Sequence, residues 1–137
     1  MEISSFRIYE NKDIAASEFA NLMASVGWGA EADYDKLLVE RSLRAYPFIA
    51  YARDEGGRLV GYVSAFSEGA FSTFIGELVV RPEAQRLGLG TELLKRVESR
   101  FPGIPLYAHP FADTEEFFIF RGYQSPERPI QTLFKIP

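Results

Sequence analysis

The chain has 137 residues, of which 47% are hydrophobic and 15% aromatic, and its formal net charge is −4. This length predicts a single domain, 1–137, and the composition supports a packed core. The acidic balance argues against a nucleic-acid-binding protein, the absence of cysteine excludes disulfides and a thiolate nucleophile, and a single histidine, His109, leaves no histidine-rich metal site. No stretch approaches the ~18 apolar residues of a membrane span, and the N-terminus lacks a signal pattern, so we expect a cytoplasmic protein with no bound metal and no membrane partner.

The first part of the chain predicts one short strand and two helices. Residues 6–9 favour a strand. A helix is expected over 13–26, with apolar residues on one face, Asn11 or Asp13 as its cap and Gly27 as its end. A second helix is expected over 34–45.

Three strands are predicted next. Residues 48–53 and 58–66 are apolar and flank Asp54-Glu-Gly-Gly, a sequence typical of a hairpin turn. The third strand covers 74–80, and Pro82, which has no N–H to donate, ends it. After Gly90 the apolar residues recur every four positions up to Phe101, which indicates a helix packed on the sheet.

The loop between that strand and that helix reads Gln85-Arg86-Leu87-Gly88-Leu89-Gly90. Glycines allow backbone N–H groups to approach a ligand closely at the positive end of a helix dipole. Arg81 and Arg86 add positive charge, so the loop predicts a phosphate-binding site rather than a glycine-rich turn that only packs the helix on the strand. Neither the P-loop pattern nor the dinucleotide pattern fits these spacings.

Residues Val80 to Gly90 match Val-x-Pro-x-x-Gln-x-x-Gly-x-Gly, which resembles the acyl-CoA signature of the GCN5-related N-acetyltransferases, the GNAT superfamily. The resemblance implies acetyl-CoA as cosubstrate, with its pyrophosphate on the loop. It also implies transfer of the acetyl group to a primary amine. The cofactor-binding residues expected from it are Leu78, Val79, Val80, Gln85, Arg86, Leu87, Gly88, Leu89, Gly90, Thr91, Phe118 and Arg121.

The rest of the chain predicts a strand over 104–108, a helix over 114–120 and a last strand over 131–136. This element order is similar to the GNAT fold. The similarity implies a mixed α+β architecture with a central, mostly antiparallel twisted sheet of 6–7 strands and helices on both faces, in which strands 74–80 and 104–108 splay apart around the cosubstrate. Residues 111–123 resemble the second family signature, but Phe118 stands where the family often has a catalytic tyrosine.

Glu77 is the expected general base, because it is an acid within an otherwise apolar strand and an alkyl amine near pKa ~10.4 must lose a proton before attack. A solvated sheet face or a pairing with arginine is the alternative, and Glu68 is a weaker candidate base. Phe118 has no hydroxyl, which leaves Tyr107, His109 and Tyr123 as substitute acids. A leaving thiol of pKa ~8.5 also departs as a thiolate at modest cost.

The resemblance places oxyanion stabilisation at a backbone N–H near Val79 or Val80. Without cysteine, we expect direct attack in a ternary complex. Aromatic and acidic residues of the first two helices and their connection would suit a cationic acceptor, either a small molecule or a peptide amine; these are Trp28, Glu31, Asp33, Asp35 and Tyr46. The alternatives to an enzyme are a non-catalytic acyl-CoA-binding module and an interaction domain without CoA. The protein could also form a homodimer.

Overall fold

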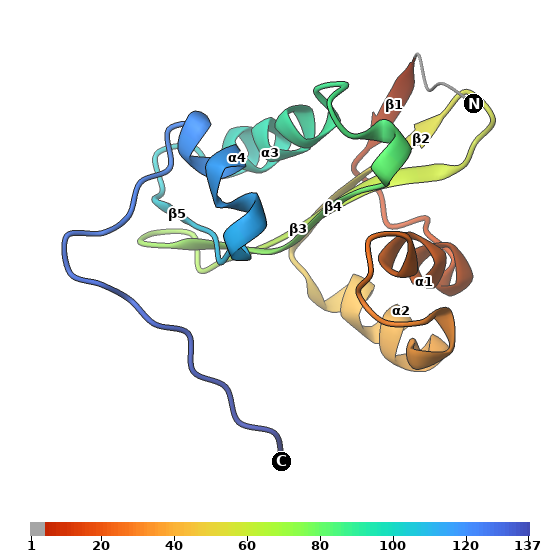
Figure 1. Ribbon diagram of the computed structural model, residues 1–137, viewed down its shortest axis with the longest axis horizontal. Helices are drawn as coiled ribbons and strands as arrows, with labels where there is room; N and C mark the ends of the chain where they lie inside the picture. The colour runs from red at the N-terminus through yellow and green to blue at the C-terminus, as the bar shows by residue number, and fades with distance from the viewer. Residues whose placement is uncertain (1–4) are drawn as a thin grey trace. The chain divides into compact units, whose positions relative to one another are not determined.

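The computed structural model describes residues 5–137, which pack as two units. The first unit extends to Tyr107 and the second covers Ala108–Pro137. The first unit contains a five-stranded sheet of order β1-β2-β3-β4-β5 (Figure 1). Its strands are β1 (Phe6–Tyr9), β2 (Phe48–Asp54), β3 (Leu59–Ser67), β4 (Thr73–Val80) and β5 (Leu106–Tyr107). Neighbouring strands are antiparallel except β4 and β5, which are parallel.

The predicted sheet of 6–7 strands is therefore too large. The strand expected over 104–108 is limited to Leu106–Tyr107, and residues 131–136 form no strand within the described chain. Proline at positions 105 and 110 flanks β5, and proline cannot donate to a ladder. Residues 131–136 have strand-like composition, yet Leu133 and Phe134 are 89% and 84% exposed. Composition alone does not form a strand, because a strand also needs the free edge of another strand to pair with.

Two helices cover one face of this sheet, α1 (Ala16–Ser25) and α2 (Lys36–Ala45), joined through the short 3-10 helix η1 (Glu31–Asp33). The start predicted at residue 13 is three residues early. Ala15 is the N-cap and its N–H donates to the Glu18 carboxylate at 3.0 Å. The core between these helices and the sheet contains Ile14, Phe19, Leu22, Met23, Val39, Leu43, Ile49, Tyr51, Leu59, Tyr62 and Val79.

The opposite face is covered by α3 (Leu89–Arg100), which follows the 3-10 turn η2 (Pro82–Ala84). Leu89, Leu93 and Val97 of α3 are buried, as their four-residue spacing predicts, and Leu94 beside them is buried as well. Gly61 of β3 allows the helix to approach, because a Cβ there would lie 3.0 Å from the side chains of Leu89 and Leu93. Helices on both faces of a mixed sheet confirm the predicted α+β class.

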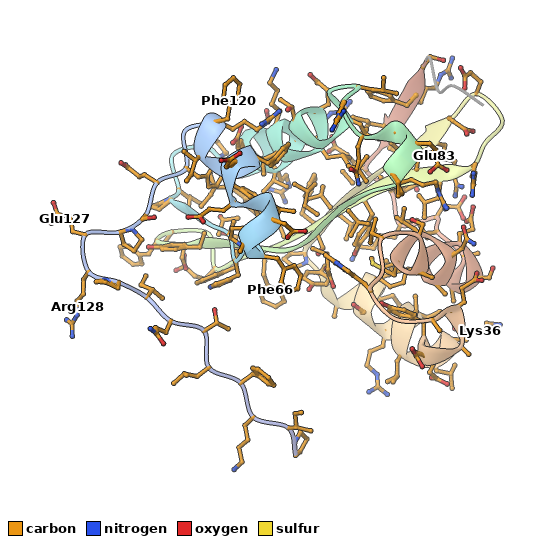
Figure 2. The ribbon with its side chains drawn as sticks, in the orientation of Figure 1. Lys36, Phe66, Glu83, Phe120, Glu127 and Arg128 are labelled. Atoms are coloured by element: carbon orange, nitrogen blue, oxygen red, sulfur yellow. The ribbon has the colours of Figure 1, made fainter. Side chains whose placement is uncertain are left out.

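The second unit contains a short 3-10 helix η3 (Ala112–Thr114) and α4 (Glu115–Phe120). Phe118 packs edge-on against Phe117 and Tyr123 within this unit. Beyond α4 the chain continues without helix or strand, and Glu127 and Arg128 project from this segment (Figure 2). None of the helices within residues 5–137 has the length and apolarity needed to cross a membrane.

Candidate active site

The middle of β4 contains a β-bulge at Gly76 and Glu77. Val63 pairs with Leu78 and Ala65 pairs with Ile75, so two residues of β4 stand opposite the single residue Ser64. The Glu77 N–H donates to the Ser64 hydroxyl oxygen at 2.9 Å, which satisfies the backbone donor that the bulge removes from the ladder.

Glu77, Ser64 and Tyr46 form a polar cluster on the α1/α2 face. The Ser64 hydroxyl donates to the Glu77 carboxylate. Tyr46, the residue that ends α2, lies across the backbone of Gly76, because a Cβ at Gly76 would be 2.7 Å from both the Tyr46 Cζ and the Ser64 Oγ. Glycine at position 76 therefore makes room for the tyrosine that packs beside Glu77.

Three tyrosines around Glu77 have raised pKa values. Burial is the main cause of the raised pKa for Tyr46 and Tyr62, and the negative charge of Glu77 is the next. For Tyr34 burial again raises the pKa most, followed by the charges of Asp33 and Glu77. These phenols are therefore neutral at neutral pH, and they provide hydroxyl groups rather than charges around the carboxylate.

Glu77 also lines a pocket of about 240 Å³ between the two helices and β4. The Tyr34 hydroxyl donates to the Trp28 carbonyl, which fixes the loop at one side of this pocket. Asp35 caps α2, where its carboxylate accepts from the Leu38 N–H at 3.1 Å. The lining residues are Phe19, Met23, Trp28, Tyr34, Asp35, Leu38, Val39, Ser42 and Glu77.

The acceptor residues predicted from the sequence separate in the structure. Trp28 and Asp35 line this pocket, whereas Glu31 is exposed on η1 and is absent from its lining. Asp33 accepts a hydrogen bond from the Ala30 N–H at 2.8 Å and holds η1. Tyr46 belongs to the Glu77 cluster rather than to the pocket wall.

Within residues 5–137, one edge of β4 has no partner strand beyond its first two residues, because β5 pairs only with Thr73 and Phe74. The Arg81 N–H donates to the Val60 carbonyl at 2.8 Å, so the alternation of an antiparallel ladder turns the Val79 N–H towards β3. The N–H groups of Leu78 and Val80 then point to the unpaired edge. Of the two expected oxyanion donors, Val80 fits this geometry and Val79 does not.

The glycine loop carries backbone donors at the start of α3. Gly88 is the N-cap residue with φ of 80°, and Arg86 also has a positive φ of 71°. The N–H groups of Leu89 and Gly90, in the first turn, have no intrahelical acceptor. The Gln85 side chain donates to the Val80 carbonyl at 2.9 Å, so this residue ties the loop to β4. Leu87 is exposed beside these donors.

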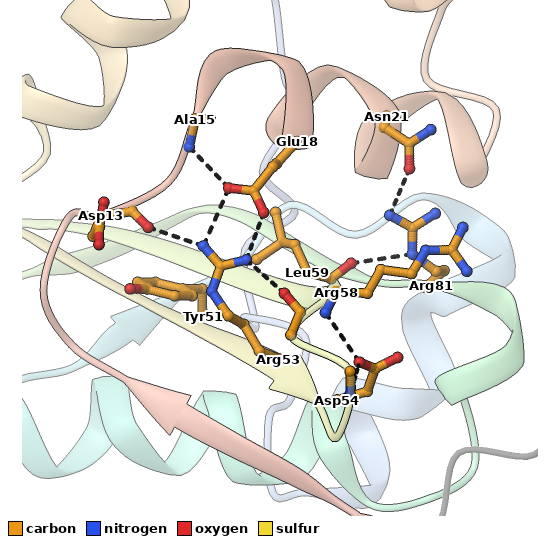
Figure 3. A network of polar contacts seen from close by, with 12 residues as sticks. Asp13, Ala15, Glu18, Asn21, Tyr51, Arg53, Asp54, Arg58, Leu59 and Arg81 are labelled. Atoms are coloured by element: carbon orange, nitrogen blue, oxygen red, sulfur yellow. Dashed lines mark hydrogen bonds and ion pairs between the residues drawn. The ribbon is translucent and has the colours of Figure 1, made fainter.

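Arg81 is not the mobile charge that the sequence suggested. It is 3% exposed, and its guanidinium donates to the Leu59 carbonyl at 3.1 Å and to Asn21 at 2.8 Å (Figure 3). Burial lowers its pKa, and the charge of Arg58 lowers it further. Arg81 therefore joins α1 to β3 beneath the loop, and Arg86, which is exposed, is the arginine at the loop surface.

A second arginine holds the N-terminal part of α1 against β2. The Arg53 guanidinium contacts the Glu18 carboxylate at 2.5 Å and donates to the Asp13 carbonyl at 3.0 Å (Figure 3). The hydrogen bond from Arg53 is the main cause of the lowered pKa of Glu18. Because Phe19 follows Glu18, this contact also positions one wall of the pocket.

The proposed substitute acids are not joined to Glu77 by a described hydrogen bond. The Tyr107 ring stacks on Phe74 with centroids 5.1 Å apart, three residues before Glu77 along β4. His109 lies in the second unit, as do Phe118 and Arg121. The Arg121 guanidinium lies 3.8 Å from the centroid of the Phe117 ring within that unit.

Glu68, the weaker candidate base, lies in the turn between β3 and β4. One of its carboxylate oxygens accepts hydrogen bonds from the N–H groups of Ala70, Phe71 and Ser72. These bonds lower its pKa, which makes Glu68 a poorer proton acceptor than an ordinary glutamate.

Sequence reasoning missed Ser64 and the tyrosines at 34 and 62. Ser64 is fully buried within the apolar strand β3, and a lone polar residue opposite an acid in the neighbouring strand was a usable signal. Tyr34 and Tyr62 had no such signal, because an aromatic residue at a core position needs no other explanation.

A larger hollow of about 490 Å³ is lined by residues of β1 and of the β2–β3 turn. Neither Glu77 nor any residue of the glycine loop 85–90 lines it.

Known structures share this architecture. A GNAT family acetyltransferase from Streptococcus pneumoniae aligns with a TM-score of 0.75 and 21% identity over 96% of this chain and 98% of its own. Glucosamine-6-phosphate N-acetyltransferase from Arabidopsis thaliana aligns with a TM-score of 0.66 and 16% identity, covering 96% of this chain and all of its own. At these identities the likeness establishes the acetyltransferase fold alone.

The family itself is shown by sequence. The model of the acetyltransferase (GNAT) family matches residues 12–116, more than three quarters of the chain, so the protein belongs to this family. Two curated relatives, both named uncharacterized N-acetyltransferase ycf52, come from Pyropia yezoensis and Porphyra purpurea. They are 24% and 25% identical over the whole of this chain and 80% of their own length.

Proposed function

We propose that this protein is an acetyl-CoA-dependent N-acetyltransferase that acetylates a primary amine by direct attack in a ternary complex. The observation that carries this proposal is the position of Glu77. Its carboxylate lines the pocket between the helices, while the N–H groups of Leu78 and Val80 in the same strand face an edge that no other strand of residues 5–137 pairs, and the strand leads into the glycine loop. One strand thus connects an amine site, an oxyanion site and an anion-binding loop.

In this mechanism the acceptor amine occupies the pocket and Glu77, directly or through a water, takes the proton that the amine loses. The nitrogen forms a bond to the acetyl carbonyl carbon, and the N–H groups of Leu78 and Val80 stabilise the oxygen that becomes negative. The carbon–sulfur bond then breaks, and the thiolate takes up a proton, for which Tyr107 and His109 are the candidate donors. The loop from Gln85 to Thr91, with Arg86, would hold the pyrophosphate.

The second candidate is a non-catalytic acyl-CoA-binding module, and the absence of a hydroxyl at Phe118 favours it. Thermal unfolding with acetyl-CoA, with ATP and NAD as controls, tests cosubstrate binding. A ligand at about 100 times its dissociation constant adds roughly 2.7 kcal/mol of stability. Thiol release on a panel of amines in the same samples then separates the enzyme from the module.

Glu77→Gln tests the base, with Glu68→Gln as the matched control. We expect Glu77→Gln to lower kcat by about 10²–10⁴-fold and to change the pH–rate profile. Glu68→Gln should leave both within twofold, because its carboxylate is occupied by the turn. An unchanged pH profile in Glu77→Gln would exclude Glu77 as the base.

A further inference from the structure

The pocket beside Glu77 has a one-sided charge. Its ionisable lining groups, apart from the neutral phenol of Tyr34, are the carboxylates of Asp35 and Glu77, and no lysine, arginine or histidine is among the lining residues. The guanidinium groups of Arg81, which is buried, and of Arg53, which is partly exposed, bind Asn21 and Glu18. An acceptor that carries a carboxylate or a phosphate would therefore meet like charge and no counter-ion.

The remaining surface of the pocket is apolar. Phe19, Met23 and Val39 are buried and form its floor, and the aromatic rings of Trp28 and Tyr34 line it as well. Aromatic faces attract cations and also pack against hydrocarbon and aryl groups. A sugar, whose hydroxyls need hydrogen-bond partners when they are buried, would find only Ser42 and the two carboxylates there.

The volume of about 240 Å³ is below the roughly 300–1,000 Å³ of pockets that enclose drug-sized ligands. Leu38 lines the pocket and is 56% exposed, so this residue marks its opening to solvent. The space suits one compact group rather than a folded peptide or a disaccharide.

We propose that the acceptor is a compact aromatic or apolar primary amine that carries no carboxylate or phosphate. Its amino group meets Glu77, and its hydrocarbon part packs against Phe19, Met23 and Trp28. This inference rests on the proposed function, because it names the acceptor of that same site. It excludes sugar phosphates and free amino acids as good acceptors.

The first test is direct binding, independent of turnover. Trp28 is the single tryptophan of the chain and lines the pocket, so its fluorescence reports occupancy. Phenylethylamine should change this fluorescence saturably, whereas phenylalanine, which adds only a carboxylate, should bind at least about tenfold more weakly. Glucosamine 6-phosphate should produce no saturable change. Equal or tighter binding of either anionic amine would overturn the proposal.

The second test uses two neighbouring leucines of α2. Leu38→Arg places a cation at the pocket opening, whereas Leu37→Arg places it at a position that is 71% exposed and outside the lining. In thiol-release assays with acetyl-CoA, Leu38→Arg should lower the preference for phenylethylamine over phenylalanine by at least about tenfold, mainly through KM, and Leu37→Arg should leave it unchanged. Equal effects of the two substitutions would contradict the assigned site.

The two tests separate failure of this inference from failure of the proposed function. Saturable binding of phenylethylamine without thiol release on any amine supports the pocket assignment and contradicts the enzyme. Turnover of phenylalanine or glucosamine 6-phosphate at rates equal to that of phenylethylamine supports the enzyme and contradicts the assigned acceptor class.

Discussion

Substitution of Gly76 by alanine tests the packing on which the Glu77 cluster depends. The added methyl carbon would lie 2.7 Å from the Ser64 Oγ and from the Tyr46 Cζ, well inside van der Waals contact. Tyr46 must then move away from β4, and its contact with Phe66, with ring centroids 5.9 Å apart, changes with it. The backbone itself is not strained, because Gly76 lacks a positive φ.

The expected cost is that of overpacking a well-packed site, about 1–3 kcal/mol of unfolding free energy. For a chain of this length that corresponds to a decrease of roughly 4–12 °C in Tm. Gly56→Ala is the matched control. A Cβ there meets only the Asp54 carboxylate at 3.5 Å, an ordinary contact, so its change should stay within about 0.5 kcal/mol.

Urea unfolding measures the loss of unfolding free energy in Gly76→Ala, Gly56→Ala and Tyr46→Phe, and in the double variant that combines Gly76→Ala with Tyr46→Phe. Because Tyr46→Phe removes the hydroxyl nearest to the added carbon, the double variant should lose at least about 0.5 kcal/mol less than the sum of the single variants. Gly76→Ala should also lower kcat/KM, since Ser64 and Glu77 must shift. A Gly76→Ala protein as stable as Gly56→Ala would refute the placement of Tyr46 over the bulge.

Three further predictions concern the first unit and the C-terminal segment. Arg81→Met should lower the unfolding free energy by about 2–4 kcal/mol in urea titrations, because the Leu59 carbonyl and Asn21 lose a charged donor; a loss below 1 kcal/mol would contradict this role. Tyr62→Phe should keep or raise stability by about 1 kcal/mol, because the buried Tyr62 hydroxyl has no hydrogen-bond partner within the described chain. Its pKa is raised on folding, so wild-type stability is retained below the unfolded pKa of about 10 and lost as pH rises above it, and Tyr62→Phe should reduce that loss. The amides of 131–136 should exchange with deuterium as fast as in an unstructured peptide, whereas protection that grows with protein concentration would indicate pairing with a second copy.

The helices and central strands followed from the sequence because their signals are local. The four-residue apolar spacing of 89–101 and the turn at Asp54 each determine structure within about a dozen residues. The strand expected over 104–108 is only Leu106–Tyr107, and the strand expected over 131–136 did not form, for the opposite reason. A strand exists only where another strand offers a free edge, and composition at 131–136 says nothing about that edge.

The candidate site followed the same division. The loop from Gln85 to Gly90 was readable because glycines and a helix start lie within one short segment. Arg81 was misread as mobile, since its partners Asn21 and Leu59 are remote in sequence and only the fold brings them together. The Glu77 surroundings have the same property, because Tyr46 and Ser64 come from α2 and β3.

The position of Glu77 depends on a single extra residue in β4. Side chains alternate between the two faces of a strand. Gly61 of β3 faces α3, so Val63 and Ala65, two and four residues further on, face α3 as well. Ile75 pairs with Ala65 and therefore faces α3 too. Strict alternation from Ile75 would direct Glu77 to the α3 face as well. The bulge shifts the alternation by one residue, so that Glu77 faces α1 and α2.

The same shift determines where the backbone donors of β4 point. Past the bulge, Leu78 and Val80 direct their N–H groups to the edge that β5 leaves unpaired, while Val79 completes the ladder with β3. A glycine within an apolar strand is a sequence signal for a bulge, and Gly76 directly precedes Glu77. That pair of residues therefore encodes both the direction of the carboxylate and the free donors beside it.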